Sequence, residues 1–479
     1  MISATTLAAL TDEVGAAVES TPSLLADYAA DWWPLATKRA ALGDPIGRPA
    51  GVVTPTDAEQ VARLVAFATA HGVPLVPWGL GSSVVGSPLA EADAILCDLS
   101  QLTGIVALSD EDLLVRVRAG MLGSDLEEEL ATYGLTTGHS PQSLDRSTVG
   151  GWVATRATGQ FSSRYGGIED MLVALEVALP GHGLVRTPIS PRPALGPDLA
   201  GLLVGSEGTF GIITEVTLRV QPIAETRLLD TLRFEDVGTL IDALRGIARS
   251  GIRPFLVRGY DHAETAHVSA GDLDGCALMI GVEGPEGPAR ADYDATVALA
   301  TAAGGSPVGP AVTEAWMGRR YDFSTIENLV ASHGGYAETI EVAALWSKAE
   351  AVHAAVTGAL AGHAQEVLGH FSHIYPQGTS LYVILLGQAE DDTAAVAALE
   401  GIWPAAMRAC EESGAAIAHH HGVGIARLPW LPNALGATAG PLEAVKRALD
   451  PAGVCNPGKL TVPPRVPPSG QRPPSEAKP

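Results

Sequence analysis

Cysteine is scarce in this sequence of 479 residues, and no two cysteines form a CxxC pair. We therefore expect neither a disulfide framework nor a cysteine metal site, and the usage is typical of a reduced, cytoplasmic protein. Uncharged apolar runs of about 18 residues are also missing, which argues against a membrane span. The N-terminal segment has acidic residues and no basic start, so we expect no signal peptide. The four cysteines are Cys97, Cys276, Cys410 and Cys455.

Positive charge is in short supply as well. Lysine and arginine number 30 against 54 aspartates and glutamates, which gives a formal net charge of −24. Such a surface repels nucleic acid and anionic membranes, so neither is an expected partner. A small-molecule substrate is compatible with the acidic charge, because a buried pocket can be locally basic. Hydrophobic residues make up 46% of the chain, and this length predicts about two to four domains, each with its own core.

The common nucleotide-binding fingerprints are also missing. The clearest glycine loop, PWGLGSS at residues 77–83, has no GxxxxGK[ST] pattern, and Val84 stands where GxGxxG needs its third glycine. NAD is therefore not the expected ligand. Small residues nevertheless let backbone N–H groups approach a phosphate closely. Two further loops of this kind, residues 147–151 and 205–211, suggest a large phosphate-bearing cofactor.

Short strand-like and helix-like patterns, in contrast, are plentiful. Residues 1–46 are predicted to form a helical arm, and residues 47–222 an α+β block of crowded short strands. Residues 223–415 alternate strand and helix patterns, which predicts a second α/β domain. Residues 416–462 carry a histidine triplet, and the proline-rich residues 463–479 are predicted to be disordered.

The densest cluster of reactive side chains is His419, His420 and His421, with His370 and His373 upstream. Imidazoles transfer protons near neutral pH, and the glycines that follow the triplet permit close approach of a ligand. If the triplet is a strand, only His419 with His421, or His420 alone, can face one pocket. We therefore assign no metal ligands, although metal binding by the cluster stays open, as does a purely structural or surface role.

Five motifs together resemble one family: PWGLGSS, QSLDRSTVGGWVATRATG, GSEGTFGIIT, HHHGVG and NPGKL. In this order they are similar to the FAD-binding oxidoreductases of the vanillyl-alcohol-oxidase, or PCMH, type, over about residues 44–460. The resemblance implies an α+β fold, with a two-subdomain PCMH-type FAD-binding domain and an α/β FAD-linked-oxidase C-terminal (cap) domain. It also implies a homodimer. Within the family, the motifs are most similar to those of alkyldihydroxyacetonephosphate synthases.

The resemblance implies FAD as the cofactor. Members that link the flavin covalently often do so through a histidine in the first glycine loop, where this chain has serines, so we expect noncovalent FAD. The implied cofactor-binding residues are Pro77, Trp78, Gly79, Leu80, Gly81, Ser82, Ser83, Gln142, Ser143, Ser147, Thr148, Gly150, Gly151, Thr155, Arg156, Ala157, Thr158, Glu207, Gly208, Gly211, Ile212 and Ile213.

The resemblance also implies catalytic residues, although this sequence differs from the synthases at two functional positions. The histidine triplet is expected over the flavin ring. An ungapped comparison of GHFSHIYPQGTSLYVILLGQA puts His370 where the synthases have a substrate-binding arginine, and Ala389 where they have an acid–base tyrosine. Arg258 falls at a recurring position, where it holds either a substrate anion or an inter-domain salt bridge.

The leading hypothesis is therefore an FAD-dependent oxidoreductase, a dehydrogenase or oxidase, that removes a hydride from a small hydroxy acid or a similar substrate. His420 or a neighbour takes the proton and Arg258 orients the substrate. The first alternative is flavin-dependent alkyl transfer of the synthase type, which the changes at His370 and Ala389 disfavour. The second is an inactive flavin- or ligand-binding protein. The electron acceptor stays open.

Overall fold

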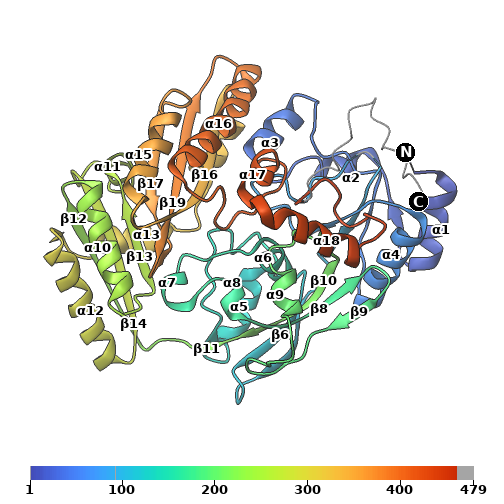
Figure 1. Ribbon diagram of the computed structural model, residues 1–479, viewed down its shortest axis with the longest axis horizontal. Helices are drawn as coiled ribbons and strands as arrows, with labels where there is room; N and C mark the ends of the chain where they lie inside the picture. Colours follow the sequence, from blue (N-terminus) through green and yellow to red (C-terminus); the bar gives the residue numbers. More distant parts are fainter. Residues whose placement is uncertain (1, 92, 461–479) are drawn as a thin grey trace, which may run out of the picture.

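The computed structural model describes residues 2–91 and 93–460, so the predicted disordered tail, residues 463–479, lies outside the described residues. Helices and strands are mixed throughout the described chain, in agreement with the predicted α+β class. Three sheets organise it, two in one half of the molecule and a larger one in the other half (Figure 1).

Three short helices occupy the N-terminal segment, α1 (Ala4–Val14), α2 (Pro22–Asp27) and α3 (Pro34–Ala41). Proline is the first residue of both α2 and α3, a position that needs no N–H donor. Trp33, just before α3, donates its indole N–H to Glu338 at 3.1 Å, which ties this segment to the large sheet.

The first sheet is small and mainly parallel. Its order is β1 (Val18–Glu19), β2 (Gly51–Val53), β4 (Ile95–Asp98), β3 (Leu75–Trp78), and β2, β4 and β3 are parallel. Helix α4 (Ala58–His71) connects β2 to β3; Asp57 caps its start, and Gly72 ends it in the left-handed conformation. Residues of α4 and of β2, β3 and β4 share one apolar core.

The second sheet is antiparallel. Its order is β5 (Ile105–Ser109), β6 (Leu114–Arg118), β10 (Ile212–Arg219), β8 (Leu172–Leu179), β9 (Gly183–Arg186). A two-stranded pair, β7 (Leu135–Thr136) and β11 (Gln221–Pro222), lies beside it. The helices of this region are α5 (Gly123–Ala131), α6 (Val149–Thr155), α7 (Ser162–Tyr165), α8 (Ile168–Met171) and α9 (Leu199–Leu203).

The third sheet has eight strands, and all its pairings are antiparallel. Its order is β15 (Ser306–Pro307), β12 (Thr226–Phe234), β14 (Cys276–Gly284), β13 (Leu256–Tyr260), β17 (Glu366–Phe371), β19 (Gly378–Gln388), β16 (Gly335–Leu345), and β18 (Ile374–Tyr375) pairs with β19. The remaining helices of this half are α11 (His262–Val268), α13 (Ala311–Arg319) and α14 (Ser324–Ala331).

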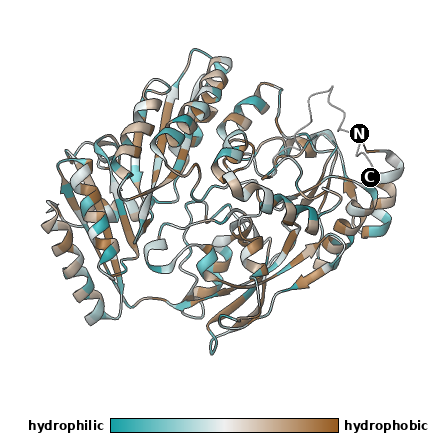
Figure 2. Cartoon of the chain, in the orientation of Figure 1, coloured by the Kyte–Doolittle hydropathy of each residue, from teal (hydrophilic) through white to brown (hydrophobic). Residues whose placement is uncertain are grey.

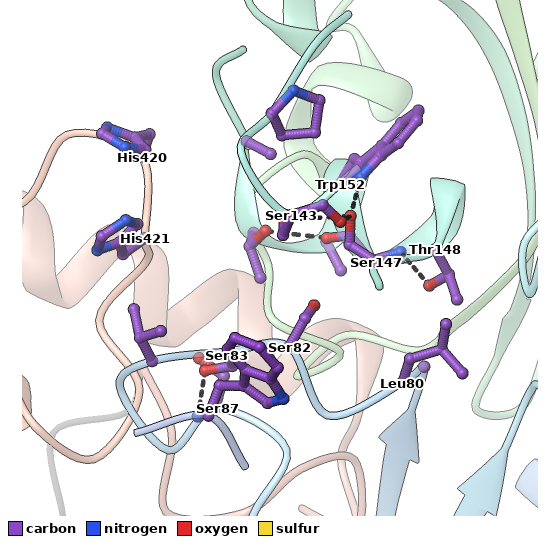
Figure 3. Close-up of a pocket in the computed structure, with 18 of the residues that line it drawn as sticks. Leu80, Ser82, Ser83, Ser87, Ser143, Ser147, Thr148, Trp152, His420 and His421 are labelled. Atoms are coloured by element: carbon purple, nitrogen blue, oxygen red, sulfur yellow. Dashed lines mark hydrogen bonds between the residues drawn. The ribbon is translucent and has the colours of Figure 1, made fainter. Parts of the chain in front are cut away.

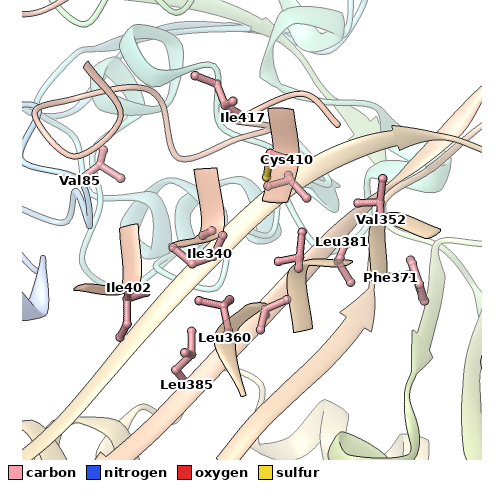
Figure 4. Close-up of a cluster of buried hydrophobic side chains, with 14 of the residues drawn as sticks. Val85, Ile340, Val352, Leu360, Phe371, Leu381, Leu385, Ile402, Cys410 and Ile417 are labelled. Carbon is pink, nitrogen blue, oxygen red and sulfur yellow. The ribbon is translucent and has the colours of Figure 1, made fainter. Parts of the chain in front are cut away.

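Four helices pack against one face of this sheet: α10 (Val237–Arg249), α12 (Glu286–Ala302), α15 (Ala349–Leu360) and α16 (Asp392–Ser413). Figure 4 shows part of the apolar core between them, which includes Ile340, Val352, Leu381, Leu385 and Ile402. Because side chains alternate along a strand, the residues between these core positions point to the other face, toward the two smaller sheets.

The C-terminal segment crosses back to the first half of the molecule (Figure 1). It contains η1 (Leu428–Trp430), α17 (Leu431–Leu435), η2 (Gly436–Thr438) and α18 (Ala439–Leu449). Beyond α18, Leu75 of β3 donates to Val454 O and Asn456 donates to Leu75 O, both at 2.8 Å. The chain therefore closes on the strand that begins the first glycine loop. Hydrophobic residues concentrate along the strands (Figure 2), and no helix of the described ranges is long and apolar enough to cross a membrane.

Candidate active site

A pocket lies where the smaller sheets, the third sheet and the C-terminal segment meet (Figure 3). The first glycine loop and the residues around Ser143–Thr148 form one wall, and the histidine loop lies across the cavity from them. Arg258, His370, His373 and Tyr382 add lining residues from the third sheet and its loops.

The first glycine loop follows β3 and requires glycine at two positions. A Cβ atom at Gly79 would lie 2.6 Å from Thr148 Oγ1, and one at Gly81 would lie 2.5 Å from the Trp78 ring. Gly81 also has φ +66°, in the left-handed region that side chains disfavour. The loop backbone therefore lies against the segment that contains Thr148 without side chains in between.

The segment from Ser143 to Thr148 is fixed by hydroxyl groups. Ser147 Oγ accepts from Trp152 Nε1 and donates to Ser143 O, each at 2.7 Å. Thr148 caps α6 by accepting from the Gly151 N–H at 3.2 Å. These bonds hold the predicted STVGG segment in place at the pocket surface.

Most of the predicted cofactor-binding residues line this pocket, and two do not. Trp78 packs beneath Gly81 and makes an edge contact with Tyr28. Arg156 is exposed and lies 3.6 Å from the Glu169 carboxylate. His373, which the sequence singled out without a role, also lines the pocket. The pocket has further lining residues that were not predicted: Trp32, Val84, Ser87, Pro88, Leu99, Pro141, Trp152, Ala154, Gln160, Phe323, Ser372, Tyr382 and Asn456.

The histidine triplet is an irregular loop, not a strand. The alternation argument therefore does not apply, and both His420 and His421 line the pocket. His419, also predicted as catalytic, lies behind them and does not line it. The strand assumption was wrong because the loop's N–H groups bond to carboxylates instead of to a neighbouring strand.

Two buried carboxylates, on opposite sides of this loop, accept hydrogen bonds from its backbone. Glu341 of β16 accepts from three successive backbone N–H groups, those of His419, His420 and His421. Glu207 accepts from the next pair, Val423 at 2.6 Å and Gly424 at 3.0 Å. The loop is thereby tied both to the third sheet and to the glycine-rich segment 205–211.

The two carboxylates differ in their charge partners. Glu341 forms an ion pair with Arg427 at 2.8 Å, and both side chains are fully buried. Glu207 is bonded instead to the Ser87 hydroxyl at 2.9 Å, and burial raises the pKa of its carboxyl group. Glu341, on the side of the third sheet, is therefore stabilised by an ion pair, whereas Glu207, on the opposite side of the loop, is stabilised chiefly by hydrogen bonds to polar groups.

Arg258 lies on β13 and its guanidinium lines the pocket. Nε donates to Tyr260 Oη at 2.8 Å and Nη2 donates to His370 Nε2 at 2.9 Å. Because His370 Nε2 accepts, its proton is on Nδ1, which lies 2.9 Å from both carboxyl oxygens of Glu264. Among the described residues Arg258 makes no salt bridge, so the inter-domain salt-bridge alternative is wrong, and Nη1 has no hydrogen-bond partner.

Burial keeps the imidazoles of the site uncharged. It lowers the pKa of His419 and of His420 to about 3, with neighbouring positive groups acting in the same direction for His420. The pKa values of His370, His373 and His421 are also well below the usual range, again mainly through burial. Near neutral pH each ring is therefore neutral and has one nitrogen without a proton, and burial disfavours a lasting positive charge on it.

His373, His419 and His420 are close enough to raise the question of a metal, since one nitrogen from each lies within 4.8 Å of the others. The rings of His373 and His419 are nearly parallel, at 11°, with centroids 5.0 Å apart. Imidazole lone pairs lie in the ring plane, so two parallel stacked rings do not aim at one ion. His419 Nδ1 and His420 Nδ1 are instead joined by a hydrogen bond of 2.9 Å.

The pocket has a tyrosine, which corrects one interpretation of the sequence. Ala389 follows the last residue of β19, and it is Tyr382, seven positions earlier on the chain, that lines the pocket. Its ring lies 5.4 Å from that of His421 and stacks on His370 at 4.9 Å. The change at Ala389 therefore does not leave the pocket without a phenol, and it no longer separates oxidation from alkyl transfer.

Comparison with protein families gives two matches that together span most of the chain. Residues 49–187 match the FAD binding domain, and residues 224–460 match the C-terminal domain of the FAD linked oxidases. The second match begins just before β12, the first strand of the third sheet along the chain.

Three curated relatives illustrate the range of the similarity. The FAD-linked oxidoreductase YgcU of Escherichia coli K12, which is uncharacterized, is 31% identical over 86% of this chain and 89% of its own length. Alkyldihydroxyacetonephosphate synthase of Trypanosoma brucei brucei is 28% identical over 86% and 73%. The mitochondrial D-lactate dehydrogenase [cytochrome] of Arabidopsis thaliana is 27% identical over 87% and 74%.

Solved structures share the fold. A structure of alkyldihydroxyacetonephosphate synthase superposes with a TM-score of 0.77 at 22% identity, over 96% of this chain and 85% of that one. p-Cresol methylhydroxylase with substrate bound also gives a TM-score of 0.77, at 15% identity, over 96% and 98%.

The pocket residues fit FAD. Three buried polar atoms of lining residues have no hydrogen-bond partner among the described residues: Gln160 Oε1, Asn456 Oδ1 and His421 Nδ1. Buried polar atoms are normally paired, so these atoms indicate a bound group that is itself polar. The ribityl hydroxyls and ring N–H of FAD are donors of the required kind, and the glycine loops offer backbone donors to its diphosphate.

Proposed function

Because this chain belongs to the family of FAD-linked oxidases, we propose that it is an FAD-dependent dehydrogenase or oxidase of a small 2-hydroxy acid. We further propose that FAD is bound noncovalently. Serines 82 and 83 stand in the first glycine loop where a covalent link would use a histidine. Acid precipitation should then leave a colourless pellet and a yellow supernatant, and a yellow pellet would contradict noncovalent binding.

The observation that carries the substrate class is Arg258. Among the described residues that line the pocket it is the only one with a full positive charge, and its Nη1 donor is unused. A carboxylate is the natural acceptor for a buried guanidinium, and charge-assisted hydrogen bonds of this kind are strong. The His370 and Tyr260 contacts fix the guanidinium in position before substrate binds.

The lining contributed by the third sheet and the histidine loop is polar: Arg258, His370, Ser372, His373, Tyr382, His420 and His421. A small polar acid suits such a surface better than a long alkyl chain does, since burying unpaired polar groups against hydrocarbon is unfavourable. This composition favours oxidation over alkyl transfer.

His420 is the proposed base. It lines the pocket, its ring is neutral, and its Nε2 has no hydrogen-bond partner among the described residues. It takes the proton from the substrate hydroxyl while the substrate carboxylate is held by Arg258. When bound, FAD supplies a hydride acceptor for the C2–H bond, and the product is a 2-oxo acid. The backbone bonds to Glu341 fix the imidazole in place.

One observation favours a second candidate, alkyl transfer of the synthase type. Tyr382 supplies a pocket phenol, and burial holds its pKa well above the usual range, so it stays protonated and can act as a donor. A phenol beside three histidines could serve acid–base steps without net oxidation.

Anaerobic mixing separates the candidates. We expect D-lactate, L-lactate, glycolate or a longer 2-hydroxy acid to bleach the flavin, with one 2-oxo acid formed per flavin reduced. Formation of an alkyl ether from a fatty alcohol and acyl-dihydroxyacetone phosphate, without lasting bleaching, would establish the transfer reaction instead. No reaction with either set of substrates would contradict both.

A further inference from the structure

Three side chains form a hydrogen-bonded chain that leads away from the pocket. His420 lines the pocket, and its Nδ1 lies 2.9 Å from His419 Nδ1. His419 Nε2 in turn lies 2.7 Å from the Tyr375 hydroxyl. Both bonds are within normal hydrogen-bond distance, so the chain is continuous from His420 to Tyr375.

The backbone around this chain is firmly held. Tyr375 belongs to β18, and its carbonyl accepts from Trp346 Nε1 at 3.0 Å. The His419 and His420 N–H groups bond to Glu341. The relative positions of the two rings and the phenol therefore do not depend on flexible side-chain contacts alone.

Neutral imidazoles in contact through two nitrogens share one proton between them, so the chain has two arrangements. In the first, His420 Nδ1–H donates to His419 Nδ1, His419 Nε2–H donates to the Tyr375 oxygen, and His420 Nε2 is bare. In the second, every donor and acceptor is reversed, and His420 Nε2 carries a proton. Only the first arrangement offers a base to the pocket.

We propose that Tyr375 and His419 form a proton relay that connects the base His420 to the outside of the pocket. The relay rests on the proposed role of His420. When the substrate O–H bond breaks, its proton binds His420 Nε2, the Nδ1 proton passes to His419, the Nε2 proton of His419 passes to Tyr375, and the original Tyr375 hydroxyl proton leaves. One proton enters and one leaves, so no charge remains on the buried rings.

The outer end of the relay is suited to release. Tyr375 is half-buried, and the residues after it, Pro376 and Gln377, are exposed. Burial raises the pKa of the Tyr375 hydroxyl, and the negative charges of Glu169, Asp170 and Glu341 act in the same direction. The phenol therefore exchanges protons without becoming a stable phenolate. Tyr375 and His419 are in this account positioning residues, because neither lines the pocket.

Long-range ¹⁵N NMR of the FAD-loaded, ¹⁵N-histidine-labelled protein tests the relay without a substrate. His419→Ala and His420→Ala variants assign the two rings. We expect a scalar coupling between the two Nδ1 atoms, and we expect Tyr375→Phe to shift the His420 Nε2 resonance, although the two residues share no hydrogen bond. Tyr293→Phe removes a phenol that bonds to Asp230 at 2.8 Å far along the chain, and should leave both rings unchanged.

A His420 Nε2 resonance that is the same in wild type and Tyr375→Phe would overturn the relay, because the phenol would then act only on its neighbour. Retention of one equivalent of zinc, with loss of the coupling between the Nδ1 atoms, would also overturn it. Full FAD content in each variant shows that the fold is intact.

Proton release gives a second readout. In weakly buffered indicator, wild type mixed anaerobically with D-lactate should release protons together with flavin bleaching, whereas in Tyr375→Phe release should lag bleaching by about tenfold or more. Simultaneous release and bleaching in Tyr375→Phe would overturn the relay. If D-lactate does not bleach the flavin, that substrate fails, and the NMR result still decides the relay.

Discussion

The two walls of the pocket are built in opposite ways. The cofactor side consists of short continuous segments, in which glycines and hydroxyl side chains leave room for backbone contact, as at Gly79, Gly81 and Thr148. The cap side consists of single side chains from separate strands, such as Arg258 on β13 and Tyr382 on β19. The cofactor side is therefore suited to holding a large group, and the cap side to carrying out chemistry.

The antiparallel register explains how the cap side is assembled. Tyr260 on β13 pairs with His370 on β17, and His370 pairs with Tyr382 on β19. Three side chains far apart in sequence thereby lie in one row on the same face of the sheet. A substitution on the cofactor side should consequently affect binding of the flavin, whereas one on the cap side should affect the reaction.

The largest effect is expected for Gly81→Val. A side chain here would collide with Trp78 and would sit at φ +66°. For a β-branched residue such a conformation costs about 1–3 kcal/mol, and relief of the strain would displace the loop from the cofactor. We expect the purified variant to be folded by circular dichroism and to lack flavin absorbance.

Gly72→Val is the matched control for that prediction. Gly72 has φ +63° at the end of α4, and a Cβ atom there would meet nothing within 4 Å. It should lower stability and keep the flavin. Full flavin content in Gly81→Val, or equal flavin loss in both variants, would show that the loop does not hold the cofactor.

Glu341 and Glu207, the two carboxylates that bond to the histidine loop, allow the contributions of the two sides to stability to be compared. Glu341→Gln leaves Arg427 buried without its charge partner, and removing one member of a buried ion pair typically costs about 3–5 kcal/mol. Glu207→Gln weakens hydrogen bonds without breaking an ion pair, and should cost about 1–3 kcal/mol. Urea denaturation of both variants measures the difference, and an equal cost would contradict the assignment of unequal roles.

Arg258→Lys tests the substrate anchor. Lysine keeps the positive charge but lacks the planar guanidinium. Arginine can contact Tyr260 and His370 and still offer a third N–H donor to the substrate, which lysine cannot do in the same geometry. Loss of one hydrogen bond to a charged group, about 1.5–3 kcal/mol, should raise KM roughly 10- to 100-fold. FAD content should not change. Arg290→Lys on the exposed part of α12 is the control, and an unaltered KM in Arg258→Lys would remove Arg258 from the substrate site.

The smallest effect is expected from pH. Burial lowers the pKa of His420 to about 3, so the neutral ring that accepts the proton is present throughout the neutral and mildly acidic range. The rate of flavin reduction at saturating substrate should therefore change by less than about twofold between about pH 5 and pH 7. With an ordinary histidine pKa of about 6.5, the rate would fall roughly tenfold per pH unit at the acidic end, and that profile would contradict a buried neutral base.

Sequence patterns named most of the residues that line the pocket around the first glycine loop, because the constraints on these segments are local. A loop that must bring backbone near another chain segment requires glycine at that position, and Gly79 and Gly81 could be recognised on this ground. The individual cofactor contacts remain predictions. Trp78 and Arg156 belong to the same motifs and do not line the pocket. Trp78 ends strand β3, where alternate side chains point to opposite faces, and Arg156 ends α6 in the left-handed conformation with its side chain exposed.

The cap side could be predicted only in part. Arg258, His370, His420 and His421 were named, whereas His373 was not assigned a role and Tyr382 was missed. The position of Tyr382 could have been inferred from the alternation of side chains along β19. Leu381, Val383 and Leu385 enter the apolar core, so Tyr382 faces the other way. Glu341, which bonds to the triplet, and Glu207, which bonds to Val423 and Gly424, were not predicted as partners of the histidine loop. Both contacts depend on how distant segments of the chain come together, which short motifs do not encode.

The most direct test of the division between the walls is the rate of anaerobic flavin reduction in His420→Ala, measured by stopped flow together with the FAD content of the same sample. We expect a substrate that bleaches the wild type to bleach the variant about 10²–10⁴ times more slowly, with FAD fully retained. A wild-type rate would contradict the assignment of His420 as the base. Loss of FAD in His420→Ala would contradict the proposal that the cofactor side binds the flavin while the cap side carries out the reaction.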